Sequence, residues 1–235
     1  MLRIIDARTG EPAPAAPARR APTRVVAHAP EADTTTLRVL LVADLLVRAL
    51  ELAGTPAWAL LPAAREPGGL RARAAALGIR PFEDGGAGPD TGQTVHVRRA
   101  GGSLPDGVTI AVAPVHPAAP DLADPDAVRL ALLARHHHAR VELDAAALDE
   151  ARDTLARLRS AVAAWARQPS RPVPVDVRDR LRAAWEDDLD APGVLRVLHG
   201  VETDPDLPDG ARFEICAYAD RFLGLHLTRD LGAPA

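Results

Sequence analysis

The sequence of 235 residues contains no lysine, so all 28 of its basic residues are arginine. This absence excludes a lysine Schiff base, a P-loop lysine and any lysine-containing loop that would hold the phosphates of a nucleotide. There is also a single cysteine, Cys216, which excludes an internal disulfide and a zinc site built from several cysteines. The chemistry of the chain must therefore rest on other side chains.

Aromatic residues and long apolar runs are also scarce. Aromatics make up 3% of the chain and apolar residues 47%, a composition dominated by small aliphatic side chains that favours closely packed helices. No apolar run approaches the roughly 20 residues that span a bilayer, and the N-terminal stretch lacks the apolar core of a signal peptide. We therefore expect a cytoplasmic protein. Its net charge of −4 gives no basic field that would recruit nucleic acid.

The first half of the chain reads as a small α/β unit. Five short apolar runs are expected as strands, at residues 2–6, 24–28, 55–61, 94–98 and 108–112. Residues 37–53 and 68–77 are expected as helices, and the strand–helix–strand order predicts parallel strands. Residues 11–22 hold four prolines and are expected as an extended surface loop without regular structure.

The second half reads as helical. From Leu148 to Trp165 apolar residues recur at intervals of three and four, the pattern of a helix packed against others, and Asp144 precedes this run as a candidate N-cap. Further helices are expected from Pro125 onwards and at 177–185, 192–201 and 211–223. The predicted fold class is α/β, with a small parallel Rossmann-like sheet domain (1–123) followed by an α-helical bundle domain (124–235).

Several stretches resemble the class I cysteinyl-tRNA synthetases. The run DPDAVRLALL at 124–133, followed by three histidines and an acidic N-cap, is similar to the start of that family's helical bundle. The run LRAAWEDDLDAPGVLRVL at 181–198 resembles its acidic helix–turn–helix, with Ala191 where threonine is usual. LRIIDARTGEP and RVVAHAP resemble its opening segment and first strand. The chain also resembles the cysteine ligase of mycothiol synthesis, a relative of the synthetases that likewise has no anticodon-binding domain.

The departures from this family bear on function. In the family the first strand ends in a zinc-binding cysteine, and the next loop carries a His-x-Gly-His signature that contacts ATP. Here the strand ends in AHAP, and the family's Lys-Met-Ser-Lys-Ser loop also has no counterpart. The resemblance therefore predicts a non-catalytic or repurposed binding protein without a cofactor. The alternative is an ATP-dependent amino-acid-activating ligase with a rebuilt active site, and only this alternative requires ATP and Mg²⁺.

Thr34, Thr35 and Thr36 form the candidate binding site. They should lie at the N-terminus of the first helix, beside the carboxyl end of a strand, where free N–H groups and the helix dipole attract anions. A weak anion site is one interpretation. Simple helix capping is the other, and it is favoured because no glycine lets a phosphate approach the backbone closely. No catalytic residue is assigned.

The three adjacent histidines, His136, His137 and His138, are the most conspicuous cluster. Consecutive residues on a helix or strand point in different directions, so we expect these side chains not to converge on one metal ion. No metal site is predicted. His28 stands where the family has its zinc cysteine, but one ligand makes no site.

The remaining polar candidates are weaker. The acidic group Asp187, Asp188 and Asp190 could bind a hard cation but is expected to be a charged helix end. His116 lies among prolines without a visible partner, and Cys216 is expected to be buried and inert. A protein partner is one hypothesis that the sequence leaves open. We do not expect strong tRNA binding, because the chain is acidic and no stretch resembles an anticodon-binding domain.

Overall fold

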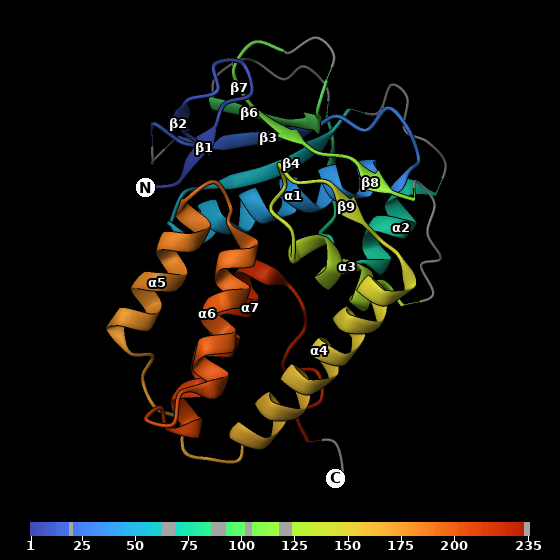
Figure 1. The fold of residues 1–235 in the computed structure, drawn as a ribbon. Coiled ribbons are helices and arrows are strands. Elements are labelled where there is room, and N and C mark those ends of the chain that lie inside the picture. Colours follow the sequence, from blue (N-terminus) through green and yellow to red (C-terminus); the bar gives the residue numbers. More distant parts are fainter. Residues whose placement is uncertain (19–20, 63–68, 86–92, 102–104, 118–123, 233–235) are drawn as a thin grey trace.

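The computed structural model describes residues 1–18, 21–62, 69–85, 93–101, 105–117 and 124–232. Figure 1 shows the described chain as layers, with a sheet on one side, helix α1 (Thr34–Leu52) lying along it, and the remaining long helices beyond α1. Gly68, the first residue of the predicted helix 68–77, falls outside the described residues. The predicted fold class is confirmed, since a parallel sheet with its helices precedes several helices.

The main sheet has five parallel strands. They are β3 (Thr23–Ala27), β4 (Ala57–Leu61), β5 (Glu83–Asp84), β6 (Gln93–Arg99) and β7 (Val108–Val112). Their spatial order is β5-β4-β3-β6-β7, with Val25 of β3 opposite Ala59 on one side and Val95 on the other. The chain thus starts at the centre, builds outwards in one direction, and then returns to build in the other. This is the strand order of a Rossmann-type sheet.

Helix α1 is the element on which both halves of the molecule pack. Almost all of its residues are buried, as expected from its nearly uninterrupted apolar sequence. It begins at Thr34, three residues before the predicted start at 37, because Asp33 caps it by accepting a hydrogen bond from the Thr36 N–H at 2.8 Å. It ends before Gly54, whose φ of +76° suits a glycine after a helix.

The N-terminal segment departs from the predictions. The expected strand forms as β1 (Arg3–Ile5), but it pairs with β2 (Pro12–Pro14) in an antiparallel hairpin and not with the main sheet. The expectation of no regular structure in 11–22 is therefore wrong for 12–14. Proline lacks only the backbone donor, and a strand at the edge of a two-stranded sheet can leave that side unpaired.

The second half forms the predicted helices. They are α3 (Pro125–Leu133), α4 (Ala145–Trp165), α5 (Val175–Glu186), α6 (Ala191–Thr203) and α7 (Asp209–Leu223). The seam of α4 is confirmed, since Leu155, Leu158 and Val162 are buried, and Asp144 caps the helix through the Ala147 N–H at 2.8 Å. A short helix α2 (Leu70–Ala76) and a parallel pair, β8 (Val115–His116) with β9 (Val141–Glu142), complete the described elements.

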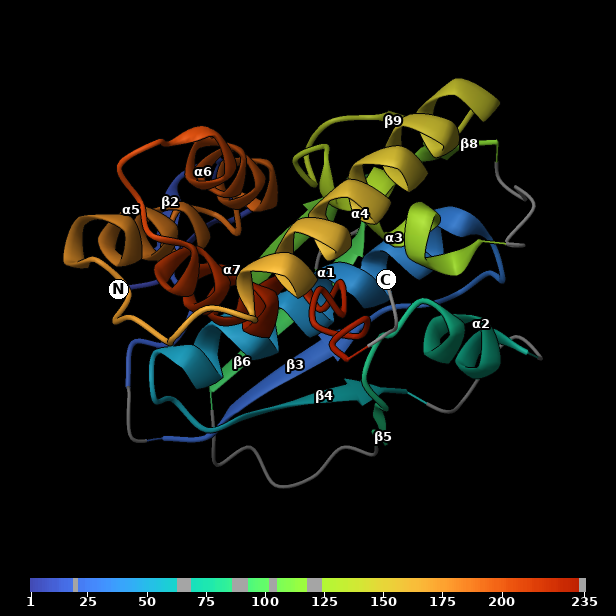
Figure 2. The same ribbon diagram turned by 90° about the horizontal axis from the view of Figure 1, so that it is seen from below.

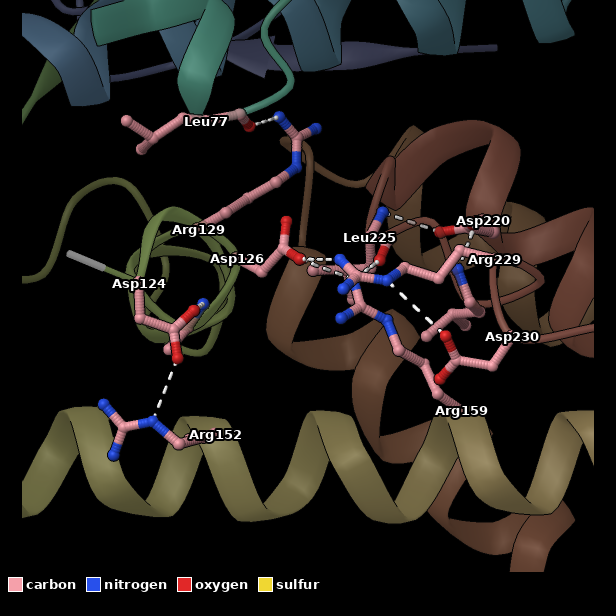
Figure 3. Close-up of polar contacts among 12 residues, drawn as sticks. Leu77, Asp124, Asp126, Arg129, Arg152, Arg159, Asp220, Leu225, Arg229 and Asp230 are labelled. Atoms are coloured by element: carbon pink, nitrogen blue, oxygen red, sulfur yellow. Dashed lines mark hydrogen bonds and ion pairs between the residues drawn. The ribbon is translucent and has the colours of Figure 1, made fainter. Parts of the chain in front are cut away.

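Polar contacts fasten α3 between the two halves, as Figure 3 shows. Buried Arg129 donates to the carbonyl of Leu77, after α2, at 2.9 Å and to that of Leu223, at the end of α7, at 2.6 Å. Asp126 accepts hydrogen bonds from Arg159 of α4 and from Arg229. The buried apolar side chains of both halves form one contiguous core. The division at 123 and 124 borders an undescribed range and stays a prediction.

Among the described helices, none is both long and apolar enough to cross a membrane.

Candidate functional site

The strand order creates a switch point between β3 and β6. The connections after these two neighbouring strands lead in opposite directions along the sheet, and open α/β sheets bind ligands outside the carboxyl ends of strands at such a point. The loop after β3 leads directly into α1, and its His28 N–H donates to the carbonyl of Val97 in β6 at 2.9 Å. The predicted site residues at the start of α1 therefore stand beside the place where a Rossmann-type sheet would hold a ligand.

The three threonines lie in the first turn of α1, and all three are buried. The Thr35 hydroxyl accepts a hydrogen bond from the Val115 N–H at 3.0 Å, which fixes the residue to β8. The Thr36 N–H donates a hydrogen bond to the carboxylate of Asp33. These are the contacts of a capped and packed helix end, which was the competing interpretation. Anion binding at the threonines stays a prediction.

Carboxylates surround this helix end. Arg99, the last residue of β6, forms ion pairs with Glu31 at 2.5 Å and with Asp33 at 2.9 Å. Arg73 of α2 donates to the Ala32 carbonyl at 2.8 Å and holds the same loop from the other side. Arg99 with its two acidic partners carries a net charge of −1. Arg73 beside the same loop brings the sum of these four charges to zero, so the loop offers no net positive charge to a phosphate approaching the N-terminus of α1.

Two histidines meet beside these strands, His28 directly after β3 and His96 in the middle of β6. His28 Nε2 lies 3.1 Å from His96 Nδ1, a hydrogen bond in which one ring donates and the other accepts. Burial lowers the pKa of His28, and the neighbouring His96 and Arg98 lower it further. Burial also lowers the pKa of His96. The pair is therefore neutral near pH 7, and His28, expected to be alone, has a partner.

The structure overturns the premise that the three adjacent histidines cannot converge. Their Nε2 atoms lie 3.8 Å (His136), 3.6 Å (His137) and 2.8 Å (His138) from one oxygen, Oδ2 of Asp188. The four ligand atoms all lie within 4.8 Å of one another. The rule of diverging side chains holds for helices and strands, whereas these residues occupy a turn closed by the Ala139 N–H on the His136 carbonyl at 2.8 Å.

The three aspartates before α6 have separate roles. Asp187 ends α5, and Asp190 caps α6 through the Gly193 N–H at 2.8 Å and pairs with Arg196. Asp188 is buried and faces the histidines. The expectation of a charged helix end is therefore right for Asp187 and Asp190 and wrong for Asp188.

Two minor candidates behave differently. His116, in β8, is exposed, and its carbonyl accepts from the Leu143 N–H at 2.6 Å. Cys216 is buried in α7, as expected, and burial raises the pKa of its thiol to about 12.

A cavity of about 550 Å³ opens between α3, α4 and α6, where α4 and α6 diverge (Figures 1 and 2). Leu130, Leu158 and Leu198 line its apolar wall, and an ion pair between Arg157 of α4 and Glu202 of α6 lies at its rim. Its volume lies within the roughly 300–1,000 Å³ typical of small-molecule sites. The sequence pattern gave no sign of it, because it depends on the angle between two helices.

Sequence reasoning also missed the arginine that organises the histidine turn. Arg38, in the second turn of α1, is 1% exposed and donates to four carbonyl oxygens, those of Ala113, Arg135, His136 and Ala139, at 2.6 to 3.1 Å. Burial lowers its pKa to about 10, so it remains charged near neutrality. An arginine within an apolar helix run is the one signal in the sequence that could have found it.

No family model matches the chain. Curated proteins similar to it include enzymes named L-cysteine:1D-myo-inositol 2-amino-2-deoxy-alpha-D-glucopyranoside ligase. The one from Acidothermus cellulolyticus is 44% identical over 106 residues, 45% of this chain and 25% of the ligase. The one from Parafrankia sp. is 52% identical over 76 residues, 32% of this chain and 16% of the ligase.

The ligase of the same name from Streptosporangium roseum is 42% identical over 113 residues, 45% of this chain and 26% of the ligase. The matches thus span about a quarter or less of each ligase. Together with the Rossmann-type sheet and the helices that follow it, they confirm the resemblance inferred from the motifs. Over part of its length, the chain is similar to the cysteine ligases, which are related to class I cysteinyl-tRNA synthetases.

Proposed function

We propose that this chain is a non-catalytic binding protein that has kept the fold of a cysteine-activating ligase without its adenylation chemistry. The proposal rests on one observation, which we call the acidic closure of the α1 N-terminus: the carboxylates of Glu31 and Asp33 pair with the groups there that could bind an anion. The Thr36 N–H donates a hydrogen bond to Asp33, and the carboxylates of Glu31 and Asp33 both form ion pairs with Arg99. The proposal is supported by these carboxylates, which lie beside the helix N-terminus where a Rossmann-type fold would receive phosphates.

The chemistry of adenylation explains why this closure matters. Activation of an amino acid by ATP develops negative charge on the phosphates, and an enzyme must meet that charge with positioned cations and hydrogen-bond donors. The chain has no lysine to supply them, and Arg99 at the switch point is paired with two acids. The His28–His96 pair is neutral near pH 7, because burial lowers both pKa values, and it supplies no positive charge.

The cavity between α3, α4 and α6 supports a binding role for the helical half. Its apolar wall and charged rim suit a small molecule with an apolar body and polar ends. It lies away from the switch point, in the part of the fold where the sequence resembles the bundle of the synthetases. We place ligand binding here and not at the sheet edge.

Two measurements test the proposal. In ATP–pyrophosphate exchange with cysteine, the untagged protein should give no signal above a control without protein. In calorimetric titration with ATP and Mg²⁺, the dissociation constant should be weaker than about 1 mM, which corresponds to less than about 4 kcal/mol of binding free energy. Micromolar ATP binding that Thr35→Ala or Thr36→Ala abolishes would overturn the proposal.

The competing function is an amino-acid-activating ligase with a rebuilt active site, of the cysteine-ligase or aminoacyl-tRNA synthetase type. The similarity to curated ligases favours it, as does the His28–His96 pair beside β3 and β6. Exchange with each of the amino acids in turn separates the two functions, because a ligase must accelerate exchange with its own substrate. Loss of that exchange in a His28→Gln variant would place the chemistry at the histidine pair.

A further inference from the structure

We propose that His136, His137, His138 and Asp188 bind one divalent transition-metal ion, with Zn²⁺ as the ion that this donor set fits best. None of these four residues belongs to the candidate site at the start of α1. The metal site brings together the turn after α3 and the turn between α5 and α6, segments separated by about 50 residues. It does not depend on the proposed function, because neither ATP nor the large cavity takes part in it.

The distances are those of a site that needs little rearrangement. Zinc binds imidazole nitrogen at about 2.0–2.1 Å and carboxylate oxygen at about 2.0–2.2 Å, so neighbouring ligand atoms in a tetrahedral site are about 3.3 Å apart. The three Nε2 atoms lie 2.8 to 3.8 Å from Asp188 Oδ2, values on either side of that spacing. The three rings are packed with centroids 4.2 to 5.1 Å apart.

An orphaned polar atom points to a missing ligand. His137 is 5% exposed, and its Nε2, directed at Asp188, has no hydrogen-bond partner among the described residues. A buried polar atom without a partner is destabilising, so a protein retains one when something else satisfies it.

The backbone around the cluster fixes the ligands before any ion arrives. Arg38 holds the histidine turn through its carbonyl groups, and the His137 carbonyl also accepts from the Ala113 N–H at 2.8 Å. Asp188 adopts a φ of +51°, unusual for a residue with a side chain, and its N–H donates to the Arg3 carbonyl at 2.9 Å. Its Oδ1 accepts from the Ile5 N–H at 2.9 Å, which leaves Oδ2 for the histidines.

The donor set and the access to it indicate the class of ion. Three imidazoles and one carboxylate suit zinc and its first-row neighbours, whereas Mg²⁺ and Ca²⁺ prefer oxygen ligands. The His138 side chain is exposed and that of His136 partly so, which gives the ion a path from solvent.

The test uses the untagged full chain freed of metal with a chelating resin. Zn²⁺ binding is measured by competition with a chromophoric chelator, and Co²⁺ binding by its visible absorption. We expect one equivalent of Zn²⁺ per chain and an intense Co²⁺ spectrum typical of tetrahedral coordination. We also expect a higher melting temperature with Zn²⁺, because an ion that binds the folded state alone stabilises it.

Matched variants separate the proposed site from adventitious binding. Asp188→Asn and His138→Gln each remove one ligand, and His138 is exposed enough for its variant to fold. Each should weaken Zn²⁺ binding by at least about 100-fold, given that changing even the partners of a ligand costs 10–100-fold. His199→Gln, which alters an exposed histidine on α6, should change nothing. Circular dichroism of each metal-free variant confirms that it is folded.

Two results would overturn the proposal. One is less than about half an equivalent of bound Zn²⁺ in the folded wild-type chain. The other is binding that His199→Gln weakens as much as His138→Gln, or that both ligand variants retain, since either would place the ion on scattered surface histidines.

Discussion

Arg38 donates from Nη2 to the carbonyl oxygen of His136 at 2.8 Å, and so joins the first helix to a turn 98 residues later in the chain. The same guanidinium reaches the carbonyls of Ala113, Arg135 and Ala139. One buried side chain thus fixes the end of the sheet, the start of α1 and the histidine turn in a single arrangement. The sheet half and the helical half share this contact, which links the fold to the proposed metal site.

Replacing Arg38 should therefore destabilise the whole chain. In Arg38→Met the four carbonyl groups lose a charged donor, and we expect the free energy of unfolding to fall by at least about 3 kcal/mol. Arg38→Lys should recover little, because an ammonium group offers three donors without the planar fork of arginine. Urea unfolding measures both. Arg180→Ala, at an exposed ion pair on α5, should cost less than about 0.5 kcal/mol. If Arg180→Ala lost as much stability as Arg38→Met, the structural role assigned to Arg38 would be wrong.

The seam of α4 makes a second prediction. Leu158 is 4% exposed and Arg157, its neighbour, has a side chain 50% exposed. Leu158→Ala should lower the free energy of unfolding by about 2–5 kcal/mol, because it removes buried methyl groups and leaves a cavity. Arg157→Ala removes only a surface pair with Glu202 and should cost about 1 kcal/mol or less. Similar melting temperatures for the two variants would contradict the orientation of α4 in which Leu158 faces the core and Arg157 faces solvent.

The contiguous core predicts that the two halves unfold together. Trp58 lies in β4, whereas Trp165 and Trp185 lie in α4 and α5, so tryptophan fluorescence can report on each half. The variant Trp165→Phe/Trp185→Phe reports on the sheet half, and Trp58→Phe reports on the helical half. We expect each fluorescence midpoint to coincide with the midpoint by circular dichroism in the same variant. Separate midpoints within one variant would show that the halves are independent domains.

Cys216 should be unreactive in the folded protein. Burial raises the pKa of its thiol to about 12, so the nucleophilic thiolate is nearly absent at about pH 8, and the side chain is only 1% exposed. A thiol reagent such as dithionitrobenzoate should react slowly in native buffer and release one equivalent in concentrated guanidinium. Rapid reaction of the native chain would mean that α7 unfolds readily or that Cys216 does not face the core.

The elements that the sequence predicts well are those determined by local patterns. The run from Leu148 to Trp165 repeats at helical spacing, and Asp144 stands where an N-cap belongs, so α4 could be placed almost to the residue. The parallel pairing of β3 with β4 follows from the helix between them. The start of α1 was placed too late, because three threonines in a row are as suitable for a cap as for a first turn.

The candidate sites depend on contacts between distant residues, and these the sequence could not supply. His138 meets Asp188 across 50 residues, and Arg38 meets the histidine turn across about 100. The argument against a metal site assumed a helix or strand at His136–His138, and the turn removes that assumption. Whether Thr34 and Thr35 are buried depends in turn on the packing of β8, which no local pattern predicted.

The acidic closure of the switch point leads to a final prediction. Asparagine caps a helix about as well as aspartate, so Asp33→Asn should preserve α1 while it removes one charge. Combined with Glu31→Gln, it releases Arg99 from both of its acidic partners. We expect this double variant to bind tripolyphosphate at least about tenfold more tightly than the wild type at low ionic strength, a gain of about 1.4 kcal/mol that salt should reduce. Glu51→Gln removes a carboxylate paired with Arg80 at the other end of α1 and serves as the matched control. If the double variant binds no better than Glu51→Gln, the carboxylates are not what closes this site, and the absence of ATP chemistry must have another cause.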